Sequence, residues 1–278
     1  MSDQGDNLEA VLAAGAATGT AAKVEPDDQY AVVPNNYRLM DLERFHPAPR
    51  RTRDKVEMQR LQSLIQYVQD FKDPGTVVYA EYDEDRIEAI IDHPVPDEPR
   101  WGDHRANYVC PKSKEWRTWN RHDGIKAGQE DFAQFLEDNQ EDIFIPESDK
   151  VAPSAADMLE FATTLNAKRN VTFNSSTRLS DGSGQLSFKE EVNDTAGKSG
   201  QMVIPGHFYI AIPVYQGGDP YVVKAKVRYR VKDGDLALWY DLHRPEKVHE
   251  RAFEGMVDQI AAEVECSIYW GIYAGSKD

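Results

Sequence analysis

Residues 221–232 read YVVKAKVRYRVK and residues 235–243 read DLALWYDLH, with Asp233 and Gly234 between them. Apolar and polar residues alternate in both runs, which is the pattern of β-strands that bury one face and expose the other. Asp-Gly between two such runs is typical of a tight hairpin, because both residues of a type I′ turn need a positive φ. The sequence therefore predicts an antiparallel hairpin over residues 221–243.

The first strand of this hairpin carries its positive charges on one face. A two-residue turn places Lys232 opposite Asp235, and counting back by pairs places Arg228 opposite Trp239. The cations at alternate positions are Lys224, Lys226, Arg228, Arg230 and Lys232. The other face is predicted to be buried and holds Val223, Val227, Tyr229 and Val231. One face of the sheet thus combines five cations with an indole ring.

This charged face has two interpretations. Basic surfaces with stacking aromatic residues hold single-stranded nucleic acid, which makes the five cations and Trp239 candidate residues for binding nucleic acid or another anion. Alternatively, the charges only solvate the exposed face and protect it from edge pairing, or acidic segments of the same chain neutralise them. The sequence leaves both interpretations open.

Shorter strand and helix patterns lie on both sides of the hairpin. The predicted strands are Thr76–Tyr82, Arg86–Asp92, Arg105–Cys110, Glu115–Asn120, Val171–Leu179, Gln185–Val192, His207–Tyr215 and Ser267–Tyr273, and Asn193–Gly200 is predicted to be a polar loop. Helical spacing of apolar residues predicts helices over Lys55–Phe71, Gln129–Asn139, Ala155–Ala167 and Glu246–Val264. Because the strands occur in runs and do not alternate with helices, the predicted class is α+β, with antiparallel β-meanders and flanking helices.

Capping residues mark the start of two of these helices. Asp54 precedes Glu57 by three residues at the first helix, and Ser154 precedes Asp157 at the third, as in a capping box. The last helix is expected to anchor to a sheet through the apolar side chains of Phe253, Met256, Val257 and Ile260.

Strand geometry also sets expectations for two pairs of residues. Trp116 and Trp119 lie three apart in a predicted strand, so we expect them to point to opposite faces. Asp103 and His104 are adjacent, so Asp103 is not expected to orient the imidazole for acid–base work. His104 is therefore interpreted as a histidine of the core or of the sheet surface.

Composition suggests how the chain is divided. Residues 1–22 are rich in Ala and Gly and are expected to be a disordered tail. Residues 23–150 form the expected N-terminal α+β lobe, and residues 151–278 form a C-terminal antiparallel sheet lobe with a terminal helix. No flexible linker separates the two lobes, so we expect them to pack as one unit.

Charge and cysteine content limit the class of protein. The 278 residues include 32 Lys or Arg and 48 Asp or Glu, which gives a formal charge of −16. This acidity argues against a general nucleic-acid coat but not against a local basic site. Only two cysteines and no long apolar run or signal peptide are present, so we expect a cytoplasmic protein that does not contact a membrane.

Motifs of catalysis and cofactor binding are missing from the sequence. There is no GxxxxGK[ST] or GxGxxG phosphate loop and no GxSxG elbow, and the seven histidines are dispersed. We therefore expect neither catalytic residues nor a cofactor nor a metal site. Residues 122–160 hold eleven Asp or Glu against two Lys, which is typical of a solvated face or of a surface that imitates a phosphate backbone.

Several short motifs carry a family resemblance. They are WGDHRANY at 101–108, SKEWRTW at 113–119, QEDFAQFLEDN at 129–139 and IPGHFYIAIPVY at 204–215. With the basic strand, they resemble the YfdQ-like family of phage and prophage proteins, domain of unknown function 2303. The resemblance implies a phage-encoded protein in the bacterial cytoplasm, with genes near those of DNA replication and recombination. No catalytic residues are carried over from the family to this chain.

Two functional hypotheses follow. The first is a non-catalytic accessory of phage DNA replication or recombination, whose partner is single-stranded nucleic acid on the basic sheet face. The alternative is an acidic interaction protein that binds or inhibits a host DNA-binding or defence factor, whose partner is a host or phage protein. Whether copies of the chain associate into a homo-oligomer stays open at this point.

Overall fold

The computed structural model describes residues 47–167, 171–180, 182–190, 199–233 and 235–275. Contacts divide the chain into Met1–Thr52, of which only 47–52 are described, and a second unit, Arg53–Asp278. The predicted tail at residues 1–22 therefore lies outside the described residues. Everything below concerns the second unit.

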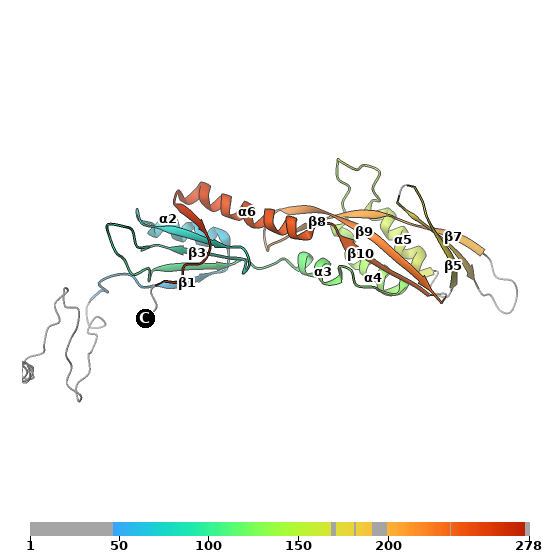
Figure 1. Ribbon diagram of the computed structural model, residues 1–278, viewed down its shortest axis with the longest axis horizontal. Helices are drawn as coiled ribbons and strands as arrows, with labels where there is room; N and C mark the ends of the chain where they lie inside the picture. Colours follow the sequence, from blue (N-terminus) through green and yellow to red (C-terminus); the bar gives the residue numbers. More distant parts are fainter. Residues whose placement is uncertain (1–46, 168–170, 181, 191–198, 234, 276–278) are drawn as a thin grey trace, which may run out of the picture. The chain divides into compact units, whose positions relative to one another are not determined.

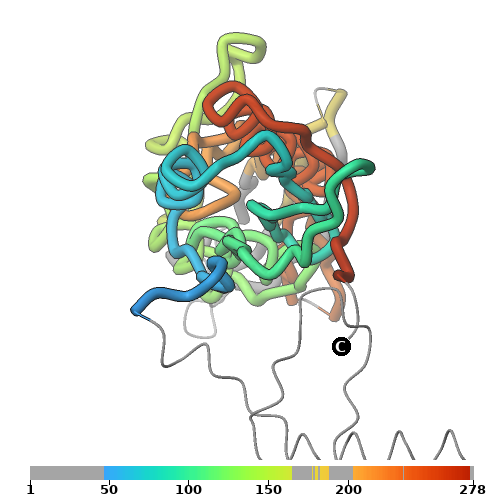
Figure 2. The backbone as a smooth tube through the Cα atoms, turned by 90° about the vertical axis from the view of Figure 1, so that its left-hand side faces the viewer, coloured from blue at the N-terminus to red at the C-terminus, as the bar shows by residue number. Residues whose placement is uncertain are grey.

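A five-stranded sheet forms one part of this unit. Its strands are β1 (Lys55–Met58), β4 (Arg105–Val109), β3 (Arg86–Ile90), β2 (Val77–Glu81) and β11 (Ser267–Trp270), in that order. The three central strands are antiparallel, as predicted, whereas β1 and β11 pair in parallel with their neighbours. The first and last strands, blue and red, lie at opposite edges of this sheet (Figure 2).

The first predicted helix is wrong in its first turn. Residues Lys55–Met58 form strand β1, and helix α2 covers only Leu61–Phe71. Val56 and Met58 alternate with charged residues, which is the two-residue period of a strand. This strand pairs with β4. The predicted capping box at Asp54 is therefore not formed.

The predicted hairpin lies in a three-stranded antiparallel sheet of order β10-β9-β8. Strand β8 covers His207–Pro213, β9 covers Pro220–Lys232 and β10 covers Asp235–Leu242. The register is the predicted one, with Lys232 paired to Asp235 and Arg228 paired to Trp239. Gly234 of the predicted turn lies outside the described residues.

Helix α3 (Lys114–His122) corrects the strand that was predicted over Glu115–Asn120. Ser113 caps it by accepting a hydrogen bond from the backbone N–H of Trp116 at 2.9 Å. Trp116 and Trp119 then lie on one buried helix face and not on opposite faces. Two residues three apart share one face of a helix but lie on opposite faces of a strand, so their spacing alone does not distinguish the two structures. The N-cap at Ser113 favours the helix.

Helix α3 and helix α4 (Gln129–Asp138) cover the inner face of the three-stranded sheet. The rings of Trp119, Phe208 and Tyr240 meet there in the core. The hydroxyl of Tyr240 also donates a hydrogen bond to the backbone carbonyl of Trp119 at 2.7 Å. This packing leaves the outer face of the sheet free of α3 and α4.

The remaining elements complete the α+β fold that the sequence predicts. A turn of 3₁₀ helix, η3 (Gln140–Asp142), follows α4, and α5 (Ala155–Ala167) has the predicted capping box between Ser154 and Asp157. Strands β5 (Val171–Arg178), β6 (Gly184–Glu190) and β7 (Ser199–Ile204) form a second three-stranded antiparallel sheet. Most of the predicted loop Asn193–Gly200 lies outside the described residues, but its last two residues begin β7.

Helix α6 (Pro245–Val264) packs against both α2 and β9, and Figure 1 shows it between the two. Phe253, Val257 and Ile260 are buried as predicted, whereas Met256 is only half-buried. This helix therefore connects the five-stranded sheet to the sheet that carries the charged strand.

Candidate functional site

The predicted cations do lie on the outer face of β9. Burial alternates along the strand, with Val223 and Val227 buried and the cations half-buried or exposed. Tyr229 and Val231 are half-buried and pack against the core, so their burial is less complete than predicted. We call the outer face of β8–β10 the basic face, formed by Lys224, Lys226, Arg228, Arg230, Lys232, Trp239, His207 and Tyr209.

Pairing across the sheet places aromatic side chains on both flanks of the cation column. Tyr209 of β8 pairs with Lys224, and Trp239 of β10 pairs with Arg228. The Lys224 ammonium lies 5.3 Å from the centroid of the Tyr209 ring. The ammonium of Lys126, from the segment before α4, lies 5.1 Å from the centroid of the Trp239 ring.

Some of the positive charge is neutralised within the chain, which the sequence left open. Arg228 Nε donates to Asp241 Oδ2 at 2.7 Å, and both side chains are partly exposed. Lys232 lies 4.0 Å from Asp233. Asp241 also lies opposite Lys226 in the strand register, but within the described residues no ion pair is found for Lys226 or Arg230.

Flanking segments of the chain line both edges of the sheet that bears the basic face. Ala127 forms a bridge with Leu238 of β10, and Ile143 forms one with Ile210 of β8. Beyond Ile143, the Asp149 carboxylate accepts hydrogen bonds from His207 and Tyr209. The acidic residues 122–160 thus contribute the Asp149 carboxylate to the border of the basic face, which is the kind of contact with an acidic segment that the second interpretation of the sequence allows.

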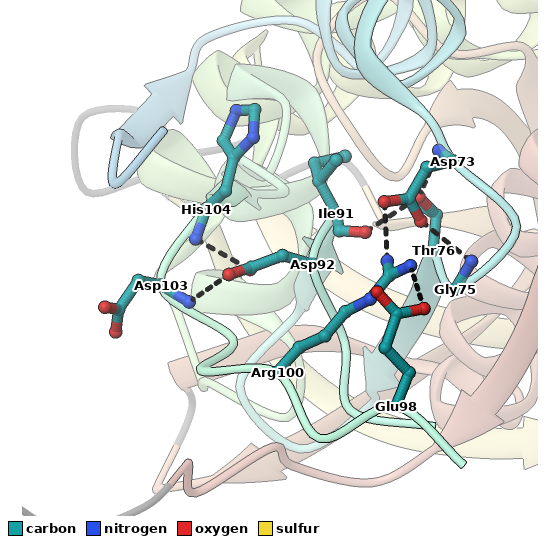
Figure 3. Close-up of polar contacts among 9 residues, drawn as sticks. All are labelled: Asp73, Gly75, Thr76, Ile91, Asp92, Glu98, Arg100, Asp103 and His104. Atoms are coloured by element: carbon teal, nitrogen blue, oxygen red, sulfur yellow. Dashed lines mark hydrogen bonds and ion pairs between the residues drawn. The ribbon is translucent and has the colours of Figure 1, made fainter. Parts of the chain in front are cut away.

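The residues around His104 make packing contacts and hydrogen bonds within the fold. His104 is buried, shares a hydrogen bond of 2.8 Å with the Tyr67 hydroxyl and packs against Phe71. The Asp92 carboxylate accepts the backbone N–H groups of Asp103 and His104 (Figure 3). Asp103 therefore does not orient the imidazole, as expected.

The same figure shows how the neighbouring loop is held. The Arg100 guanidinium donates to the carboxylates of Asp73 and Glu98 (Figure 3). Asp73 in turn accepts the backbone N–H of Gly75 at 2.7 Å. These contacts fasten the loop between β3 and β4 to the turn that follows α2.

A second polar cluster, centred on Asp85, was missed by sequence reasoning. Its carboxylate accepts hydrogen bonds from His249 Nε2 at 2.6 Å, the Tyr215 hydroxyl at 2.5 Å and Lys112 Nζ at 3.0 Å. The Tyr82 hydroxyl lies 3.1 Å from His249 Nδ1. These groups come from four separate segments of the chain, so no local motif marks the cluster.

The electrostatics of this Asp85 cluster favour an ionised carboxylate. Burial raises the pKa of Asp85, but the three hydrogen-bond donors outweigh burial and lower the pKa to about 2. Burial also raises the pKa of the nearby Cys110 thiol to about 12, so this cysteine is not a thiolate at neutral pH. The cluster holds segments together and does not present an activated nucleophile.

A groove of about 780 Å³ lies next to this cluster and shares Tyr215 with it. Its walls come from residues 59–62 at the start of α2, residues 214–219 after β8 and residues 252–259 of α6. Its lining combines four glutamines and the oppositely charged Arg60 and Asp219 with apolar and tyrosine side chains. The cations of the basic face do not line it.

Fold and site define an α+β protein with an exposed, partly neutralised basic sheet face. The chain belongs to the family described as uncharacterized conserved protein (DUF2303), whose model matches residues 4–273. No curated protein and no solved structure gives a significant match. In the described part of the chain, no group of His, Cys, Asp and Glu is arranged to hold a metal ion, and no helix is long and apolar enough to span a membrane.

Proposed function

We propose that the protein binds single-stranded nucleic acid on the basic face and serves as a non-catalytic accessory of phage DNA replication or recombination. The observation that carries this proposal is the column of five outward-facing cations on β9, with Trp239 paired to Arg228. Such a column is unusual in a chain with a formal charge of −16.

The distance between successive cations of the column suits an extended single strand of nucleic acid. Alternate residues of a strand are about 7 Å apart, so the cations repeat at a distance comparable with that of phosphates in an extended single strand. Lys226 and Arg230, for which no ion pair is found in the described residues, supply the freest contacts. The acidic remainder of the surface repels phosphate and confines binding to this column.

The aromatic residues favour a single strand over a duplex. Trp239 and Tyr209 lie on opposite flanks of the column, where unpaired bases can stack on their rings. A duplex keeps its base faces stacked inside the helix and gains only the phosphate contacts. To stack on Trp239, a base takes the place of the Lys126 ammonium, which then becomes a further phosphate contact.

The biological setting is a separate part of the proposal. It is supported by the family resemblance, which implies a phage or prophage protein. The alternative partner, a host DNA-binding or defence factor that docks on the acidic residues 122–160, has no specific geometric support in the described residues. Nucleic acid on the basic face is therefore the function that we prefer.

The test is binding of a labelled single-stranded oligonucleotide, measured by fluorescence anisotropy at low salt. Trp239→Ala should weaken binding by about 1–3 kcal/mol, because one stacking contact is lost. Trp101→Ala is the control, since this exposed tryptophan lies outside the basic face. Absence of binding by the folded parent protein, or equal binding by both variants, would contradict the proposal.

A further inference from the structure

An acidic side chain occupies one end of the basic face. Asp149 Oδ2 lies 2.9 Å from His207 Nε2 and 3.1 Å from the Tyr209 hydroxyl. A carboxylate oxygen only accepts hydrogen bonds, so both of these groups donate. Lys224 pairs with Tyr209 across the sheet and adds a positive charge beside the same carboxylate.

His207, Tyr209 and Lys224 face the Asp149 carboxylate together, and we call these three groups the cradle. His207 and Tyr209 are two residues apart on β8, so both side chains point to the outer face, where Lys224 also lies. Hydrogen bonds from His207 and Tyr209 lower the pKa of Asp149, which keeps its carboxylate charged. The cradle thus already holds a negatively charged oxygen atom.

Asp149 is held there by a chain segment that leaves the sheet. The backbone N–H of Phe144 donates a hydrogen bond to the backbone carbonyl of Tyr209 at 2.9 Å. The backbone N–H of Asp149 then donates to the Pro146 carbonyl, which closes a turn. The side chains of Asp149 and His207 are 28% and 27% exposed, so solvent reaches the contact. An oxyanion from solution can therefore approach these groups from the exposed side of the contact.

We infer that Asp149 occupies a phosphate subsite on the basic face and competes there with a phosphate of the bound strand. This inference rests on the proposed function and concerns how that same site is regulated. A phosphate oxygen can accept the same two hydrogen bonds and is attracted by Lys224 in the same way. The internal carboxylate weakens binding by the free energy needed to displace it.

The experiment compares Asp149→Asn with Glu147→Gln in oligonucleotide binding. Both variants remove one negative charge from the same segment, but Glu147 is exposed and makes no described contact with the basic face. Asp149→Asn should tighten binding about three- to tenfold, whereas Glu147→Gln should change it by less than about twofold. The salt slope of Asp149→Asn should also be steeper by about 0.7, because Lys224 then exchanges a counterion for phosphate.

A second variant tests whether the gain arises in the cradle. Adding His207→Ala to Asp149→Asn should remove most of the gain in affinity, because a phosphate in the vacated subsite then lacks the hydrogen bond from His207. A contact that only fastens the 143–150 segment would instead give lower thermal stability and unchanged binding. If the parent binds and Asp149→Asn binds no more tightly than Glu147→Gln, the inference is wrong and the proposed function stands. If none of the folded proteins binds, both are wrong.

Discussion

Asp85 adopts a left-handed backbone conformation, with φ of 50°, in the turn between β2 and β3. Asn is among the few residues that tolerate this conformation, so Asp85→Asn removes the charge without adding backbone strain. The substitution is therefore a clean test of the Asp85 cluster. Asp85→Ala would combine both effects.

The first prediction concerns acid stability. The pKa of Asp85 is lowered to about 2, so its charge stabilises the folded state above its ordinary pKa, and this stabilisation is lost as the pH falls through the folded value. Between about pH 5 and pH 3, the parent should lose about 1 kcal/mol more unfolding free energy than Asp85→Asn. Urea unfolding at the two pH values measures this difference. Parallel losses in both proteins would show that the Asp85 charge does not stabilise the fold.

The Asp85 cluster also shows why part of the molecule was not predictable. Lys112, Tyr215 and His249 lie 27, 130 and 164 residues from Asp85 in the sequence. Only the tertiary fold brings them together, and each residue type is ordinary where it stands. The cations of β9, by contrast, share one strand, and their common face follows from a two-residue period alone.

Among the elements, local patterns predicted the α+β class and most helices and strands. The register of β9 and β10 could be predicted because two signals agree on the same pairing. These are the Asp-Gly turn and the alternation of apolar and polar residues in both strands. The parallel pairing of β1 with β4 and of β11 with β2 could not be predicted, because no local pattern specifies a partner distant in the chain. For α3, the strand interpretation gave too little weight to Ser113 as an N-cap.

The second prediction concerns helix α6. Phe253 is fully buried, and its ring centroid lies 5.8 Å from those of Tyr82, which directly follows β2, and of Trp270 in β11. Phe253→Ala should lower the unfolding free energy by about 3–5 kcal/mol, because it removes a large buried side chain and leaves a cavity. Chemical denaturation measures the loss, with exposed Glu254→Ala as the control. Equal stability of the two variants would mean that α6 does not dock through this residue.

For the molecule as a whole, the central claim is that an acidic chain concentrates positive charge on one sheet face. Such a face should give weak binding that depends strongly on salt, since the contacts are made to phosphates. Arg228 is a poor choice for testing this because Asp241 already neutralises it. Lys226 and Arg230 are better, since no ion pair is found for either in the described part of the chain.

The most direct measurement is the salt dependence of oligonucleotide affinity for the parent, for Lys226→Ala with Arg230→Ala, and for Arg121→Ala with Arg251→Ala. The control pair removes equal charge at two exposed cations of α3 and α6 that lie outside the basic face. We predict that the slope of log affinity against log salt falls by about 1.4 for the Lys226 and Arg230 pair, about 0.7 for each lost phosphate contact, and is unchanged for the control. Equal slopes in all three folded proteins would contradict the account.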